Sequence, residues 1–357
     1  MKALKMILIL FFIGISAVMQ AQSSSDQTVE QTLSKLSKIA AQKYLEPGMT
    51  AFGSNLNSGW VNMIPSPKKL GFDLTIKFVG MGTFLTDKPT TFSTAGSFKF
   101  TSSQADNILA NSGISMSDPS YEYVKQQLLS KEWNVNFNGP TIIGKDNEYL
   151  RISFPGGTVA GRQLNAYTET VTGVKGLLNG MSMLPTGAPQ ITVGTLMGTA
   201  VSFRYLPSIS FDNLGSLDFW GVGIIHNPEV WLQNPLPVNI AIGIFTQKLK
   251  LGTIVETNAT QYGIYVSKTF GDALSITPYV GFTIESSKTK VNYDYEYSTI
   301  INGASVQAKD KINFEIEGEN SGSLLLGMTF KLIVVNINVD YKLAKYNTLS
   351  GGISFAF

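Results

Sequence analysis

The sequence contains no cysteine and a single histidine, His226, among its 357 residues. The absence of thiols excludes disulfides, thiol catalysis, Cys-ligated zinc and iron–sulfur clusters. One histidine cannot build a multi-histidine metal site, and no Gly-x-Ser-x-Gly nucleophile elbow accompanies it. We therefore expect no enzyme: no catalytic residue, no metal and no cofactor. The alternative, His226 as a general base, ranks behind a position at the end of a strand.

Charged residues are also scarce, at 15% of the chain, where soluble proteins carry about a quarter. Lysine and arginine number 27 and acidic residues 25, and loss of the two lysines in residues 1–21 would leave 25 of each sign. A balance near zero gives no electrostatic reason to expect nucleic acid as a partner.

Residues 1–21 are predicted to be a signal peptide. Lys2 and Lys5 precede an apolar run at 6–19, and Ala21 supplies a small residue at the cleavage point. The run is too short to span a bilayer as a helix, although a short N-terminal anchor helix is the alternative. No later stretch of 18 apolar residues appears, so the hydrophobic residues must be distributed in another way.

They are distributed by alternation. Ile337 and Val339 alternate with Asn336, Asn338 and Asp340, and similar patterns occur at 72–78, 201–205, 240–244, 262–267 and 276–282. Period two indicates β-strands with two different faces, of a length that suits tilted transmembrane strands. The polar face is mostly small and neutral, which favours a barrel lumen over the charged exterior of a sandwich. A periplasmic all-β protein is the alternative.

We therefore predict an all-β fold, an antiparallel transmembrane β-barrel of about 12–14 strands with a short N-terminal helix. The barrel would cover 49–357, with an irregular insertion at about 87–194. Within the insertion we expect helices near 104–111 and 121–130 and strands at 132–138, 141–143 and 149–154, forming a long loop or a small plug-like subdomain. A hairpin at 286–323 should extend beyond the bilayer.

The N-terminal segment 22–48 contains the clearest predicted helix, Gln27 to Tyr44. Asp26 can serve as its N-cap, and Pro47 with Gly48 should end it. This helix is either a soluble amphipathic helix docked on the barrel or a plug inside or below it.

The chain ends on an aromatic residue, with Ile353, Phe355 and Phe357 on one face of the last strand. This pattern resembles the recognition signal of bacterial outer-membrane barrels, in which an unpaired edge strand is offered to the insertion machinery by β-augmentation. The expected partners are thus the barrel assembly machinery and outer-membrane lipid, and the expected location is the bacterial outer membrane.

Several further motifs resemble a Bacteroidota outer-membrane family of uncertain function. They are LPTGAP at 184–189, GTAVSFRYLP at 198–207, WGVGIIH at 220–226 and PVNIA at 237–241. The resemblance covers mainly residues 50–86 and 184–357. The chain is also loosely similar to the transporter barrels for long-chain fatty acids and aromatic hydrocarbons, which carry an N-terminal plug. Their plug motif, small residues with Asn-Pro-Ala turns, is not evident here.

Two functional hypotheses follow. The first is a passive channel for uptake of small hydrophobic or amphipathic molecules. Its lumen would be lined by Arg204, Tyr265, Asn336, Asn338 and Asp340, which could contact a small hydrophobic ligand. The second is a structural or surface-binding outer-membrane protein without transport activity, which would use the long hairpin to meet a partner.

Overall fold

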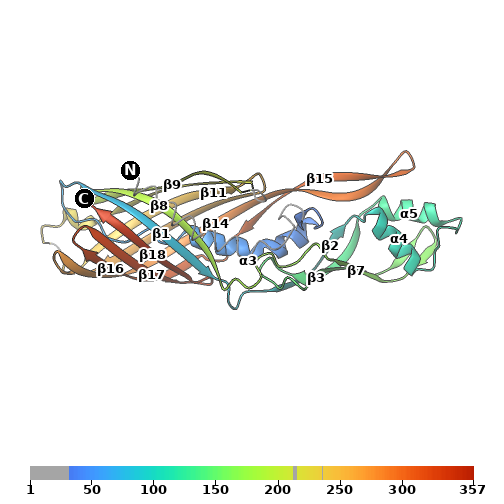
Figure 1. Ribbon diagram of the computed structural model, residues 1–357, viewed down its shortest axis with the longest axis horizontal. Helices are drawn as coiled ribbons and strands as arrows, with labels where there is room; N and C mark the ends of the chain where they lie inside the picture. Colours follow the sequence, from blue (N-terminus) through green and yellow to red (C-terminus); the bar gives the residue numbers. More distant parts are fainter. Residues whose placement is uncertain (1–31, 212–214, 235) are drawn as a thin grey trace.

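The computed structural model describes residues 32–211, 215–234 and 236–357. Within these ranges, ten antiparallel strands form a closed barrel, and a narrower extension projects from one end (Figure 1). The barrel strands are β1 (Asp73–Phe84), β8 (Met183–Leu196), β9 (Thr199–Phe211), β10 (Gly215–His226), β11 (Asn239–Leu251), β12 (Val255–Ser267), β14 (Leu274–Ile301), β16 (Gly322–Leu332), β17 (Val335–Leu343) and β18 (Thr348–Ala356). Each pairs with its neighbours, and β1 pairs with β18 to join the two ends of the sheet.

The predicted antiparallel barrel is confirmed, but its strands number ten rather than 12–14. The prediction divided the whole chain by the length of a strand and its turn. Two long segments do not enter the barrel wall, which accounts for the difference. One is the segment between β1 and β8, and the other is the hairpin that β14 forms with β15 (Ala304–Glu317).

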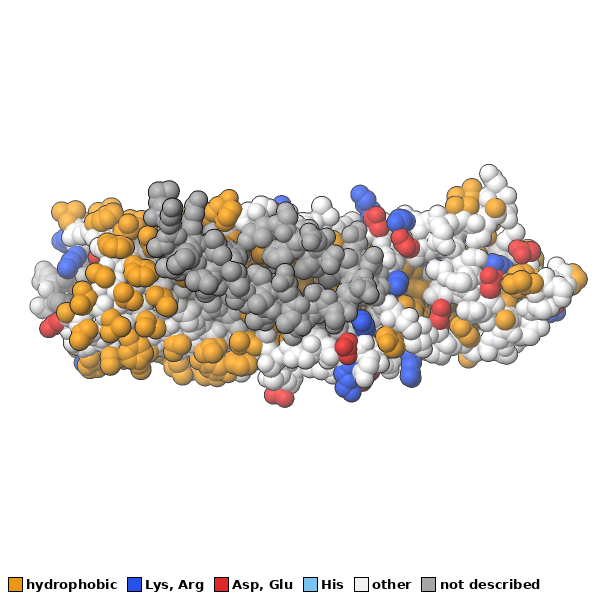
Figure 2. All heavy atoms as spheres, viewed as in Figure 1, with side chains coloured by type: hydrophobic (Ala, Val, Ile, Leu, Met, Phe, Trp, Pro, Cys, Tyr) orange, Lys and Arg blue, Asp and Glu red, His pale blue; other side chains and the backbone are white. Residues whose placement is uncertain are grey.

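Apolar side chains cover the outside of the barrel and polar side chains face its inside. On β17, Ile337 and Val339 are 43% and 49% exposed, whereas Asn338 and Asp340 are buried. The other strands of the barrel wall show the same arrangement, which is the reverse of that in water-soluble proteins, where apolar side chains are buried. Exposed apolar residues include Ile191, Val201, Phe203, Ile224, Ile242, Ile264, Ile276, Phe282, Leu326, Phe330 and Ile353. Figure 2 shows hydrophobic side chains gathered over the barrel, while the charged ones lie mainly over the extension.

Glycines on the inner face make room for aromatic rings from the next strand. Tyr265 of β12 is paired with Gly281 of β14, and a Cβ on this glycine would lie 2.6 Å from the Tyr265 ring. Tyr279 and Gly327 form an equivalent pair. Any larger residue would displace the ring, so these glycines let bulky side chains lie flat against the wall.

The two ends of the barrel differ. At one end, which we call the turn end, β8 and β9 and likewise β16 and β17 are joined by tight turns, and the last strand finishes there (Figure 1). β13 (Phe270–Gly271) and the short helix η1 (Pro228–Trp231) lie between barrel strands. The opposite end carries the extension, and we call it the extension end.

The extension is a small subdomain with its own hydrophobic core. Four strands, β2 (Thr91–Phe98), β3 (Trp133–Pro140), β4 (Leu150–Phe154) and β7 (Tyr167–Val171), form a sheet, accompanied by the β5 (Gly157–Val159) and β6 (Arg162–Leu164) pair and by α4 (Ser102–Asn111) and α5 (Tyr121–Leu129). Tyr293 and Tyr295 of the long hairpin pack into the same core. The predicted hairpin and both predicted helices are present, and the segment forms a subdomain beyond the barrel.

Two predictions for this region are wrong. Residues 141–143 form a turn rather than a strand, and residues 183–194 belong to barrel strand β8 instead of the irregular insertion. Pro185 and Pro189 lie within β8, opposite Gly82 and Phe78 of β1. Proline disfavours a central strand because it lacks the N–H donor, so the sequence pattern argued against this strand.

Helix α3 (Lys38–Leu56) joins the subdomain to the barrel. It does not end at Pro47 and Gly48 as predicted but continues for nine residues beyond the proline. Burial of Met49, Ala51 and Leu56 offsets the hydrogen bond that Pro47 cannot donate. Residues 34–37 are not helical, and the predicted N-cap Asp26, like the signal peptide at 1–21, lies outside the described residues. In the described part of the chain, no helix is long and apolar enough to cross a membrane.

Candidate functional site

The barrel lumen is occupied by the chain itself. The last turn of α3 enters at the extension end, and residues 57–65 continue through the interior towards the start of β1 (Figure 1). We call residues 53–65 the plug segment. This plug lies later in the chain than the predicted segment 22–48, whose buried residues such as Leu33, Leu36 and Tyr44 pack in the core of the subdomain. A residual cavity of about 10 Å³ remains between the plug segment and the wall near Trp60 and Tyr265.

Wall side chains donate hydrogen bonds to successive backbone carbonyls of the plug segment. Lys77 Nζ lies 3.0 Å from the Gly59 oxygen, and Arg204 Nη1 lies 3.1 Å from that of Ser58. The other donors are Lys342 to Ser54, Gln190 to Trp60, Tyr279 to Val61, Thr329 to Asn62 and Asn227 to Pro65. Because a carbonyl is present in every residue, this set recognises an extended backbone more than a particular sequence.

The charged residues of the lumen fall into two groups. Lys342 and Glu285 form a fully buried ion pair, with 3.0 Å between Nζ and Oε2. Lys77, Arg204 and Asp340 form a second group, in which the Asp340 charge acts on both cations but forms no ion pair within 4.0 Å among the described residues. The formal charges of this second group sum to one positive charge.

Trp60 of the plug segment contacts both a cation and an aromatic ring. The Arg204 guanidinium carbon is 3.8 Å from the centre of the Trp60 ring, and the Phe245 ring stacks on the indole at 5.1 Å. Gly221 of β10 leaves room for this indole, because a Cβ there would lie 3.1 Å from it. Trp60 thus fills a slot that Arg204 and Phe245 border.

The structure places all five predicted lumen residues inside the barrel. Arg204 contacts the plug segment directly, and Tyr265 borders the small cavity beside Trp60. Asp340 accepts a hydrogen bond from Tyr279, with 3.2 Å between the oxygens. Asn336 and Asn338 are buried on the same face of β17. Their role in binding a ligand stays a prediction.

The sequence analysis missed Lys77, Lys342, Glu285 and Gln190 as lumen residues. A signal was present for three of them. Lys77 stands on the polar face of the alternating segment 72–78, Lys342 follows Asp340 by two positions on β17, and Glu285 extends the alternation of β14. Nothing in the local pattern of residues 57–65 predicts a plug, because these residues show neither helical nor strand periodicity.

The start of α3 is anchored in the subdomain. Tyr293 of the hairpin donates a hydrogen bond to the Leu36 carbonyl at 2.8 Å, and Tyr44 donates to the Lys175 carbonyl at 2.9 Å. Burial raises the pKa of Tyr44 far above its ordinary value, so the phenol remains a neutral donor at physiological pH. One continuous helix therefore connects the core of the subdomain to the plug segment.

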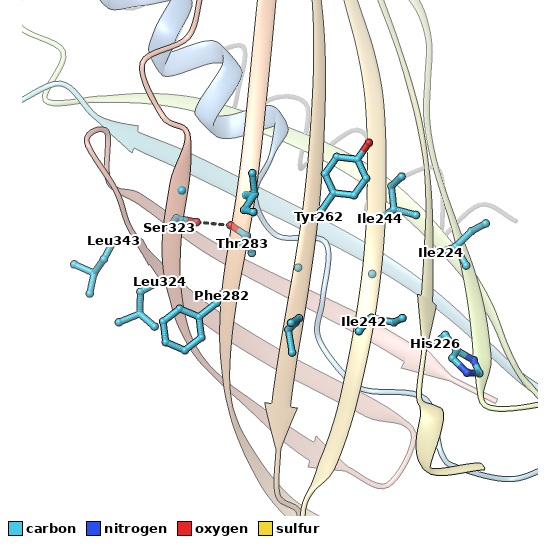
Figure 3. A pocket seen from close by; sticks show the side chains of 15 residues that line it. Ile224, His226, Ile242, Ile244, Tyr262, Phe282, Thr283, Ser323, Leu324 and Leu343 are labelled. Atoms are coloured by element: carbon cyan, nitrogen blue, oxygen red, sulfur yellow. Dashed lines mark hydrogen bonds between the residues drawn. The ribbon is translucent and has the colours of Figure 1, made fainter. Parts of the chain in front are cut away.

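A shallow apolar groove lies on the outer surface of β10, β11, β12, β14 and β16 (Figure 3). It has a volume of about 1030 Å³ and is lined by side chains such as Ile242, Ile264 and Phe282, with His226 at one edge. His226 Nδ1 lies 3.0 Å from Thr199 Oγ1. No cluster of three or more His, Asp or Glu residues positioned to hold a metal occurs within the described ranges.

The chain belongs to the family described as "Family of unknown function (DUF6588)", whose model matches residues 1–357. No curated protein matches the sequence. Solved structures that match include in-vitro folded OmpT of Vibrio cholerae, at 9% identity and a TM-score of 0.21, covering 80% of this chain and 99% of that one. The transport unit of the autotransporter AIDA-I from Escherichia coli matches at 9% identity and a TM-score of 0.26, covering 87% and 98%. Both TM-scores are too low to indicate a shared structure or function.

Proposed function

We propose that this member of a family of unknown function is a bacterial outer-membrane barrel, closed at rest by its plug segment, that lets small amphipathic molecules pass when the segment moves. The observation that carries the proposal is the row of buried wall donors, among them Lys77 and Arg204, that end on plug carbonyls. Lumens that are permanently filled can be packed with apolar side chains. Cationic donors facing a backbone suit an occupant that can leave.

The outer surface supports the membrane location. Apolar side chains on the exposed face of strand after strand would cost free energy in water, whereas a belt of this kind is what hydrocarbon requires of a transmembrane barrel. Closure of the sheet leaves no unpaired edge in the barrel wall, which the bilayer core also demands.

The two ends support an orientation. Bacterial barrels have short turns on the periplasmic side and longer loops outside. The turn end would therefore face the periplasm, and the subdomain with the long hairpin would face the exterior. Ile353 and Phe355 of β18 and the exposed Phe357 that follows it lie next to the seam with β1. This supports the barrel assembly machinery as the partner of the last strand before the seam closes.

The proposal can be tested by locking the plug segment to the wall. Ser54 Oγ of α3 lies 2.8 Å from Thr348 Oγ1 of β18, and the chain has no cysteine of its own. In the double variant Ser54→Cys/Thr348→Cys, oxidation should form a disulfide that holds the plug in place. We expect channel openings in planar bilayers to become roughly tenfold rarer or more on oxidation and to return on reduction, because the covalent link holds the plug segment against the wall beside it.

The matched control is Thr257→Cys/Thr289→Cys, which links two buried, paired threonines of β12 and β14 without touching the plug segment. Its openings should not depend on the redox state. Equal opening frequencies for oxidised and reduced Ser54→Cys/Thr348→Cys would contradict the proposal. So would the absence of any opening in the reduced protein.

A second candidate is a surface-binding protein without transport, favoured by the subdomain with its independent core beyond the barrel. It predicts that removal of the hairpin tip around Asn302 and Gly303 abolishes binding to a partner while the barrel stays folded. Cell-surface binding that survives the deletion would exclude this candidate.

A further inference from the structure

We propose that the slot occupied by Trp60 is a binding site for a small aromatic monocarboxylate, which takes the place of the indole and its neighbouring carbonyls when the plug segment moves. The inference rests on the proposed function and names the class of molecule that uses the lumen. Its basis is a chemical resemblance. The plug segment offers the wall a flat indole ring beside carbonyl oxygens, and an aromatic monocarboxylate would offer a flat ring beside carboxylate oxygens.

The first argument is the arrangement of donors. Three consecutive carbonyl oxygens, from Ser58, Gly59 and Trp60, accept hydrogen bonds from Arg204, Lys77 and Gln190. Arg204 Nε also donates to Gln190 Oε1 at 2.9 Å, which fixes the guanidinium in place. An oxyanion held at this point would gain charge-assisted hydrogen bonds that a neutral carbonyl cannot match.

The second argument is charge. Lys342 is already paired with Glu285, and the formal charges of the group of Lys77, Arg204 and Asp340 sum to one positive charge. Arg204 is fully buried, and its Nη2 has no hydrogen-bond partner in the described part of the chain. A single carboxylate would balance the group and satisfy this donor, whereas a cation would add to the imbalance.

The third argument is shape. Once Trp60 leaves, Arg204 and the ring of Phe245 would border the space that the indole filled. Tyr265 lies edge-on to Phe245, with 6.3 Å between the ring centres. Ala241 and Leu325 complete an apolar cluster on this side. The site therefore combines cationic donors with aromatic and apolar side chains.

The experiment measures openings and current in planar bilayers with three probes at neutral pH: benzoate, acetate and benzyltrimethylammonium. Benzoate has both the ring and the negative charge, acetate lacks the ring, and the third probe has the wrong charge. We expect benzoate to raise the opening frequency about tenfold above either of the others. Acetate lacks the ring that would fill the place of the indole, and benzyltrimethylammonium lacks the carboxylate that would accept charge-assisted hydrogen bonds.

Arg204→Gln should abolish this preference, and Lys77→Gln, as a second variant in case the first does not fold, should weaken it. Asp340→Asn should strengthen it because the opposing charge is removed. A matched control is Lys248→Gln at the extension end, paired with Glu256, which should leave the preference unchanged. Openings that respond equally to the three probes would overturn this inference while leaving the proposed function intact. If no opening occurs with any probe, both fail.

Discussion

Replacement of Ile264 by arginine is expected to destabilise the folded barrel by about 2–4 kcal/mol, the cost of an arginine near the bilayer midplane. Ile264 is on β12, 56% exposed, between the outward residues Ile242 and Phe282 of the neighbouring strands. In a water-soluble protein, an exposed isoleucine would tolerate arginine within about 0.5 kcal/mol. The free energy of unfolding in lipid vesicles, measured by denaturant titration, distinguishes an outer face in hydrocarbon from one in water.

Val306 provides the control for this substitution. It lies on β15 in the hairpin beyond the barrel and is 41% exposed. Val306→Arg should change the free energy of unfolding by no more than about 0.5 kcal/mol, because water surrounds it in either case. If Ile264→Arg proves as mild as Val306→Arg, the outer belt does not face hydrocarbon and the membrane proposal fails.

Replacement of Lys342 by methionine is expected to cost about 3–5 kcal/mol, since it leaves the Glu285 carboxylate buried without its counter-charge. Both side chains are within 1% of complete burial, and Lys342 also donates to the Ser54 carbonyl of the plug segment. The same unfolding titration measures the loss.

The double variant Lys342→Met/Glu285→Leu removes both charges and should recover most of the stability, because apolar residues often replace a buried ion pair without net loss. The unpaired Ser54 carbonyl should retain a penalty of about 1–3 kcal/mol. A single variant no less stable than the double variant would show that Glu285 is not held as a buried charge.

The barrel could be predicted from the sequence because the alternation of apolar and polar residues is visible within each strand. Alternation on segments such as 335–343 decides which side chains lie on the outer face of the barrel, and the same rule placed Arg204 and Asp340 inside. The interpretation failed where context outweighs the local pattern. Pro185 and Pro189 sit in β8, where neighbouring strands supply the pairing, and α3 passes Pro47 because both of its sides are buried.

The plug segment could not be predicted for a different reason. Its strongest contacts use backbone carbonyls of residues such as Ser58 and Gly59, and these groups leave no trace in a sequence. The donors that meet them come from strands as distant in the chain as β1 and β17. Only the closed sheet brings them together around one segment.

The plug segment is tied at both of its ends. On one side it continues into β1 of the barrel wall, and on the other α3 is anchored in the core that contains Leu36 and Tyr44. It can shift or bend aside, but it cannot diffuse away from the donors that it leaves. For a captive segment on a short tether, the effective concentration is on the order of millimolar. A solute that opens the lumen by displacement must therefore either be abundant at the cell surface or bind the vacated donors more tightly than the chain's own carbonyls do.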